Sequence, residues 1–149
     1  MNRKLRDLLN LPFVYNSEKS QEVAEELLKL KINDNMRLIT LDIKNMYVNL
    51  LITGIMQTAS YWLNKHNNHN KQTSKQVLNM INTIVKQNYF QYQGQIFQPQ
   101  KYSNGSPMSS TSAEIYLQFL ENIYIKHWLD SKEISFYKRY VADILILRI

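Results

Sequence analysis

Hydrophobic positions along this chain follow two spacings, one of about 3.6 residues and one of about two. Helical spacing predicts a helix that Ser17 can cap, with an apolar face over residues 23–30, and further helices over residues 52–63 and 77–85. Between the first two helices, the apolar run from Arg37 to Leu41 predicts a strand. The N-terminal half is therefore expected to be mostly helical around one strand.

The C-terminal half predicts a hairpin, one long helix and a second pair of strands. Residues 90–98 alternate between apolar and polar on both sides of a Gln-Gly pair, which is the pattern of a β-hairpin. Helical spacing continues over residues 109–128, and strands follow over residues 134–141 and from residue 144 onward. This order predicts an α+β fold, an antiparallel sheet with helices on one face.

Length and composition indicate one domain that is not anchored in a membrane. The chain has 149 residues and no internal repeat or linker, so we expect a single domain over residues 1–149. Its last apolar run, residues 144–149, stops inside a strand, which indicates a piece of a longer protein. No secretory signal, membrane-length apolar run or cysteine occurs, so we expect an intracellular protein, nuclear or cytoplasmic. Its oligomeric state is left open.

The net charge says little about the partner of this protein. Lys and Arg outnumber Asp and Glu by 18 to 12, which gives a formal net charge of +6. Such a surplus favours a polyanionic partner. Ordinary soluble domains often carry a similar charge, so composition alone leaves nucleic-acid binding open.

Two acidic residues carry the candidate chemistry. Asp42 ends the first predicted strand, and Asp143 lies at the turn between the last two strands. A carboxylate at the tip of a buried strand is costly unless water, a metal or a cation compensates it. Brought together, two such tips would form a hard-oxygen site suited to magnesium and to phosphoryl transfer. Chain order alone does not establish that they are adjacent.

Each candidate residue also has a purely structural interpretation. Asp42 fits an ordinary aspartate at a strand end, and Asp143 is a good turn former. Tyr47 fits a core position as well as a nucleotide contact. The cations that flank the candidate site are Lys101, Lys138 and Arg139. They are candidates for phosphate contacts, although an exposed cation needs no function.

Three ordered motifs resemble the fingers and palm of a reverse transcriptase of the kind carried by Penelope-like retroelements. The first runs from Leu41 to Asn49, the second from Asn88 to Glu121, and the third from Phe136 to Asp143. The second motif contains Gly105-Ser106-Pro107-Met108-Ser109 before an amphipathic helix. The resemblance covers residues 11–149 and implies a palm-like antiparallel sheet with partial fingers and no thumb.

The resemblance implies an RNA-directed DNA polymerase, a nucleotidyltransferase of a retrotransposon. Its partners would be an RNA or DNA template with a primer, together with deoxynucleoside triphosphates. Asp42 and the Ile43 carbonyl would bind two Mg²⁺ or Mn²⁺ ions, with Asp143 as a further metal ligand. Tyr47 would stack under the incoming sugar and exclude a ribose 2′-hydroxyl. Asn104 and Gly105 would line the nucleotide and template side.

This sequence departs from the family pattern at the catalytic hairpin. Ala142 stands where the family has the first aspartate of Tyr-Val-Asp-Asp, and Asp143 matches the second. A slip of one residue would make Asp143 the first aspartate, but the flanking residues fit the unshifted register better. Lys101, Asn104 and Ser110 also depart from the pattern. The alternatives are a catalytically dead nucleic-acid-binding remnant and a degenerate reading frame.

Overall fold

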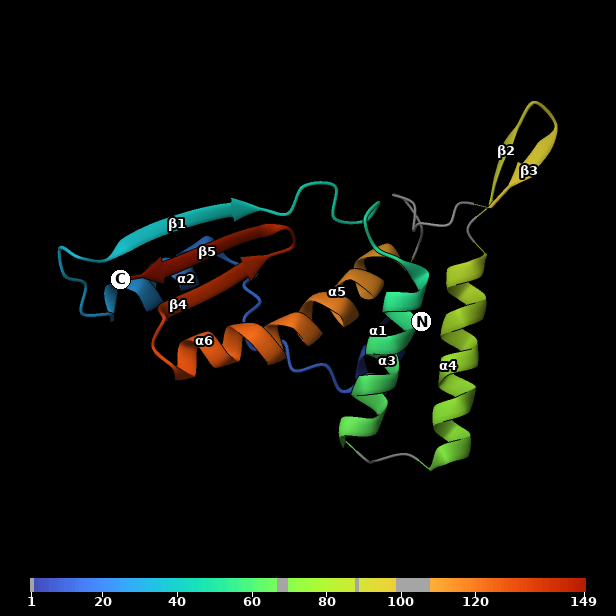
Figure 1. Cartoon of the computed structure of the whole chain (residues 1–149), viewed down its shortest axis with the longest axis horizontal. Coiled ribbons are helices and arrows are strands. Elements are labelled where there is room, and N and C mark those ends of the chain that lie inside the picture. The colour runs from blue at the N-terminus through green and yellow to red at the C-terminus, as the bar shows by residue number, and fades with distance from the viewer. Residues whose placement is uncertain (1, 67–69, 88, 99–107) are drawn as a thin grey trace. The chain divides into compact units, whose positions relative to one another are not determined.

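The computed structural model describes residues 2–66, 70–87, 89–98 and 108–149, and Figure 1 shows its helices and strands. In chain order these elements are α1 (Asn2–Leu9), α2 (Ser20–Leu28), β1 (Arg37–Asp42), α3 (Ile52–His66), α4 (Lys71–Lys86), β2 (Phe90–Tyr92), β3 (Gln95–Phe97), α5 (Ser109–Leu120), the π-helical turn η1 (Glu121–Ile125), α6 (Lys126–Asp130), β4 (Ile134–Tyr140) and β5 (Asp143–Arg148). The α+β class is confirmed. No helix among the described residues is long and apolar enough to cross a membrane.

The chain forms two compact units. Unit 1 comprises Met1–Pro12 and Asn45–Phe119, and unit 2 comprises Phe13–Lys44 and Leu120–Ile149. Each unit therefore joins segments that are distant in the sequence.

Unit 1 is a group of helices together with the β2–β3 hairpin. Its core contains apolar side chains that α3 and α4 place at helical spacing, namely Ile55, Ala59, Trp62, Leu63, Val77, Ile81 and Val85. The Trp62 indole nitrogen donates a hydrogen bond of 3.0 Å to the Ile115 carbonyl of α5, which satisfies the one polar atom of a buried ring. Asn70 caps α4 by accepting from the Thr73 amide at 2.7 Å.

Unit 2 contains an antiparallel sheet in the order β1-β5-β4. One sheet face packs on η1 and α6 through a cluster of Ile125, Ile134 and Tyr137, with Tyr15, Leu129, Ile144 and Ile146 against it. The opposite face is bordered by α2, whose Glu26 forms an ion pair with Lys138 of β4. Helices therefore lie near both faces of this sheet, whereas the sequence predicted them on one.

Three further details differ from the sequence prediction. The helix expected to be capped by Ser17 begins at Ser20 with Lys19 as N-cap, because the Ser17 hydroxyl donates to the Lys19 carbonyl instead. Helix α1 was not predicted, since charged residues surround its two fully buried leucines, Leu5 and Leu9. The long helix over residues 109–128 is present, but it contains the π-helical turn η1.

Candidate functional site

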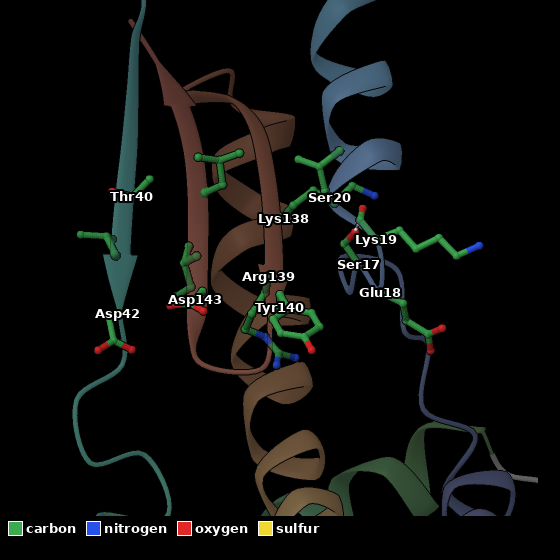
Figure 2. Close-up of a pocket in the computed structure, with 14 residues that line it drawn as sticks. Ser17, Glu18, Lys19, Ser20, Thr40, Asp42, Lys138, Arg139, Tyr140 and Asp143 are labelled. Carbon is green, nitrogen blue, oxygen red and sulfur yellow. Dashed lines mark hydrogen bonds between the residues drawn. The ribbon is translucent and has the colours of Figure 1, made fainter.

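The site is built on the two strand ends that carry the aspartates. Asp42 is the last residue of β1, Asp143 is the first residue of β5, and the two are directly opposite in the antiparallel register. Directly opposite residues in such a pair point to the same face of the sheet. Figure 2 shows their carboxyl groups side by side at one end of the sheet. Both residues are exposed.

The two carboxylates carry like charges at close range. Like charges directly opposite each other on a sheet are destabilising. Among the described residues, neither carboxylate forms an ion pair with a cationic side chain. Lys138, a cation on this face, is bound to Glu26 at 3.0 Å. The pair is therefore suited to an external cation that would relieve the repulsion.

A tight turn determines where Asp143 lies. Tyr140 pairs with Asp143, so the loop between β4 and β5 consists of Val141 and Ala142. Val141 has a φ of +52°, in the left-handed region that β-branched residues rarely adopt. Strain of this kind costs on the order of 1–3 kcal/mol, and it persists only where the surrounding structure enforces it.

Two hydrogen bonds hold the strained turn. The Ile43 amide donates to the Ala142 carbonyl at 2.9 Å, which ties the turn to the residue after Asp42. The Arg139 Nη1 donates to the Val141 carbonyl at 2.9 Å. The turn is therefore fixed from both neighbouring strands, and with it the position of Asp143.

Arg139 is itself held by a buried network. Arg139 is 1% exposed and Glu121 of η1 is 4% exposed, and they form a charge-assisted pair through Arg139 Nε and Nη2. The Tyr137 hydroxyl donates to the same carboxylate at 3.0 Å. Burial, and then the Glu121 charge, hold the pKa of Tyr137 well above its ordinary value. The network joins η1, β4 and the turn.

The N-terminal segment of unit 2 completes this network. Asn16 Oδ1 accepts from Arg139 Nη2 at 3.4 Å. The Arg139 backbone amide donates to the Tyr15 carbonyl, and its carbonyl accepts from Ser17, so this segment covers the outer edge of β4. The Tyr15 ring contacts the Tyr137 ring edge-to-face at 5.5 Å. Burial, with smaller effects from Asp130 and Glu121, raises the pKa of Tyr15.

An open groove lies beside the acid pair. Its volume is about 720 Å³, within the usual range for small-molecule sites. It is lined by the α2 N-terminus and by the sheet ends that carry Asp42, Tyr140 and Asp143 (Figure 2). The groove therefore places the carboxylates next to a space large enough for a ligand.

The structure brings together only some of the residues predicted for the site. Asp42, Ile43, Lys138, Arg139 and Asp143 all belong to unit 2. Tyr47 is half-buried in a turn of unit 1. The other predicted residues, Lys101, Asn104 and Gly105, lie outside the described residues.

The positions of Lys138 and Arg139 differ from the expected phosphate contacts. The guanidinium of Arg139 is buried against Glu121, so it does not present its charge to a surface ligand. Lys138 remains partly accessible but is neutralised by Glu26. Strand alternation placed the two cations on opposite faces of β4, which the sequence prediction did not take into account.

Sequence reasoning gave no role to Glu121, although a signal for its role was present. Glu121 lies four residues after Leu117 and four before Ile125, so it interrupts a buried apolar stripe. A carboxylate in such a stripe requires a cationic or hydrogen-bonding partner. The sequence did not show which cation fills that role.

The described residues contain no group of three or more His, Cys, Asp or Glu side chains placed to hold a metal ion. The site as described offers two carboxylates. Ala142, at the second position of the turn, contributes no ligand.

The fold matches solved telomerase structures. Apo telomerase from Candida tropicalis, truncated from its C-terminal domain, aligns with a TM-score of 0.73 and 15% identity over 98% of this chain. Telomerase from Candida albicans, in complex with the TWJ fragment of telomeric RNA, aligns with a TM-score of 0.67 and 14% identity over 99% of this chain. This chain spans 33% and 30% of those chains, about a third of their length.

These matches define the class of fold. Over nearly its whole length the chain shares the fold of these telomerase structures. No family model and no curated protein matches the chain. At 14–15% sequence identity, similarity to these structures establishes only the fold. The function has to be argued from the residues of the site.

Proposed function

We propose that this chain is the fingers-and-palm part of an RNA-directed DNA polymerase from a Penelope-like retroelement, with Asp42 and Asp143 as cation-binding carboxylates. The observation that carries the proposal is the direct cross-strand pairing of these two residues within a reverse-transcriptase-like fold. The two acidic residues are about a hundred positions apart in the sequence, and yet they are paired at the end of one sheet. The three sequence motifs support the retroelement origin.

The donor set fits a divalent cation. Two exposed carboxylates on one face are hard oxygen ligands of the type that Mg²⁺ and Mn²⁺ prefer. The Ile43 carbonyl is a further oxygen donor in the same segment. When bound, the metal ions of such a centre neutralise charge at the phosphate under attack and lower the pKa of the attacking hydroxyl. The substrates would be a primed template and deoxynucleoside triphosphates.

The remaining residues of the site position the acid pair. Arg139 and Ile43 hold the turn by its two carbonyls, and Glu121 holds Arg139. This arrangement keeps the Asp143 carboxylate opposite Asp42 without any contribution from exposed, flexible side chains. Pre-organised ligands of this kind favour a site that binds without rearrangement.

The resemblance assigns further roles that remain predictions. Tyr47 would exclude a ribose 2′-hydroxyl, while Asn104 and Gly105 would line the nucleotide and template side. Lys101 would contact phosphate. These proposals rest on their motif positions alone.

A second candidate function is that of a nucleic-acid-binding remnant without polymerase activity. The observation that favours it is Ala142, which occupies the turn position where the family has its first hairpin aspartate. Two carboxylates leave a two-metal centre one ligand short. We therefore expect the activity of this chain to be low as it stands.

Primer extension on an RNA template distinguishes these functions. The variant Ala142→Asp adds the missing carboxylate between β4 and β5, beside the pair already present. We expect it to extend a labelled primer at least about 100-fold faster than the unchanged chain, in a Mg²⁺- or Mn²⁺-dependent manner. The measurement is product length against time on a denaturing gel.

The matched control is Ala142→Asn, which has the same shape without the charge and should give no gain. A second control, Asp42→Asn in the Ala142→Asp background, should abolish the gain. If Ala142→Asp binds primer–template but extends it no faster than Ala142→Asn, the polymerase proposal fails and the remnant is supported.

A further inference from the structure

The β2–β3 hairpin presents an aromatic surface that no part of the site above uses. Its turn, Gln93-Gly94, has positive φ at both residues, the geometry of a tight hairpin that matches strand twist. The register pairs Phe90 with Phe97 and Tyr92 with Gln95, so three aromatic rings share one face. Every residue of the hairpin is exposed, with Phe90 at 54%, Tyr92 at 62% and Phe97 at 40%.

Two rings of the aromatic face pack against each other. The Phe90 and Phe97 rings stack with their centroids 5.4 Å apart and an interplanar angle of 19°. Paired rings restrain each other, so the face is ordered without a ligand. The polar residues of the hairpin are glutamines, which carry no charge. An exposed, uncharged set of aromatic rings suits a planar partner that can stack on it.

The sequence segment that contains this hairpin carries lysines and no acidic residue. From Asn45 to Ala113 the sequence has five lysines and no Asp or Glu. Helix α4, which precedes the hairpin in Figure 1, has exposed Lys71 and Lys75 in its first turns and exposed Lys86 at the end that leads into the hairpin. The Gln98 side chain donates to the Lys86 carbonyl at 2.6 Å, which ties the hairpin base to the end of this helix.

The exposed aromatic rings belong to a segment that contains lysines but no acidic residues, and this combination fits one class of ligand. We propose that the Phe90, Tyr92 and Phe97 face binds unpaired bases of single-stranded nucleic acid by stacking, with Lys86 near the phosphates. Stacking is tolerant of sequence because every base has a planar face. A duplex hides those faces, so this surface selects single strands. The proposal is independent of the acid pair and of any polymerase chemistry.

Fluorescence anisotropy with labelled 20-nucleotide oligo(dT) and oligo(U) tests this surface on the full chain in EDTA. Tyr92→Ala should weaken binding by at least about fivefold, since it removes one stacking platform. Tyr92→Trp should restore or tighten binding, because the indole offers a larger face. Neither substitution should change the dependence of affinity on salt, because neither removes a cation.

The matched control lies on the opposite face of the same hairpin. Ile96 is 73% exposed and does not share the aromatic face, so Ile96→Ala should bind single strands like the unchanged chain. Circular dichroism of each variant checks that the chain remains folded. EDTA removes the divalent cations that the acid pair would hold, so binding measured in its presence is separate from the proposed function.

Three outcomes would overturn the proposal. The first is equal loss of binding in Ile96→Ala and Tyr92→Ala, which indicates a general hydrophobic surface. The second is equal affinity for duplex and single strands. The third is a dimer, seen by light scattering, that Tyr92→Ala dissociates while oligonucleotide binding is unchanged, which assigns the face to a second copy of this chain.

Discussion

Val141 is a β-branched residue whose φ of +52° lies in the left-handed region. Nothing in its side chain favours this conformation, since crowding between Cβ and the following carbonyl costs roughly 1–2 kcal/mol there. The Arg139 and Ile43 hydrogen bonds enforce it from either side. At the residue scale, the strained turn and the facing carboxylates are two unfavourable features that a purely structural hairpin would not need.

Replacing Val141 with glycine should relieve this strain. Val141→Gly should raise the free energy of unfolding by about 1 kcal/mol, since glycine adopts positive φ without steric cost. The measurement is the midpoint of urea denaturation at constant m-value. Ala142→Gly is the control: Ala142 has no positive φ, so glycine there should destabilise the chain. Destabilisation by Val141→Gly would contradict the strain.

Tyr137 makes stability depend on pH in the alkaline range. Its folded-state pKa is raised above 10.0, its ordinary value, first by burial and then by Glu121. Its contribution is therefore fully present below about pH 10 and is lost as pH rises, because only the unfolded chain releases the proton. Stability should fall above pH 10 by up to about 1.4 kcal/mol per pH unit from this group.

The comparison that isolates this effect is Tyr137→Phe, which keeps the ring and removes the titrating hydroxyl. Urea denaturation between pH 8 and 11 should give a shallower alkaline decline for the variant. Parallel declines in the two proteins would show that Tyr137 titrates alike in the folded and unfolded chains.

At the scale of elements, the sequence predicted most helices and strands but not how they pair. The spacing of hydrophobic residues and the turn residues predicted β1, the β2–β3 hairpin and the β4–β5 hairpin, because those signals are local in the sequence. The adjacency of β1 and β5 depends on contacts between residues about a hundred positions apart, which no local pattern encodes. The sequence likewise did not show which face of β4 carries Arg139, because that face is identified by the ion pair with Glu121 in the structure.

The ion pair between Glu121 and Arg139 joins η1 to β4, and breaking it from one side should be costly. Arg139→Met leaves the Glu121 carboxylate buried without its cation and should destabilise unit 2 by roughly 3–5 kcal/mol. Replacing both, as Glu121→Leu with Arg139→Met, should recover much of that loss. Denaturation of the single and double variants measures the coupling. Additive losses would mean the pair does not act as a unit.

At the scale of the whole molecule, the charge is divided unevenly between the two units. Unit 1 carries eight Lys and Arg against two Asp and Glu, whereas unit 2 carries ten of each. The formal surplus of +6 thus belongs to unit 1, and the unit with the acid pair is neutral overall. Polyanion binding is therefore expected to depend mainly on unit 1.

This division predicts different salt responses for lysines in the two units. Removing Lys71 and Lys75 as Lys→Gln should lower the slope of log affinity against log salt for single strands, by up to about 0.7 for each phosphate that a lysine no longer neutralises. The matched pair in unit 2 is Lys126 and Lys132, both exposed, and their replacement should leave the slope unchanged. Equal changes from both pairs would contradict a charge surface confined to unit 1.

The central claim is that Asp42 and Asp143 form one cation site, and Mn²⁺ binding followed by electron paramagnetic resonance tests it most directly. The unchanged chain should bind one Mn²⁺ ion that Mg²⁺ displaces, and Asp42→Asn and Asp143→Asn should each abolish binding. Ala142→Asp, with a third carboxylate, should bind more tightly. If the unchanged chain and Asp42→Asn take up Mn²⁺ alike, the paired carboxylates do not form a metal site.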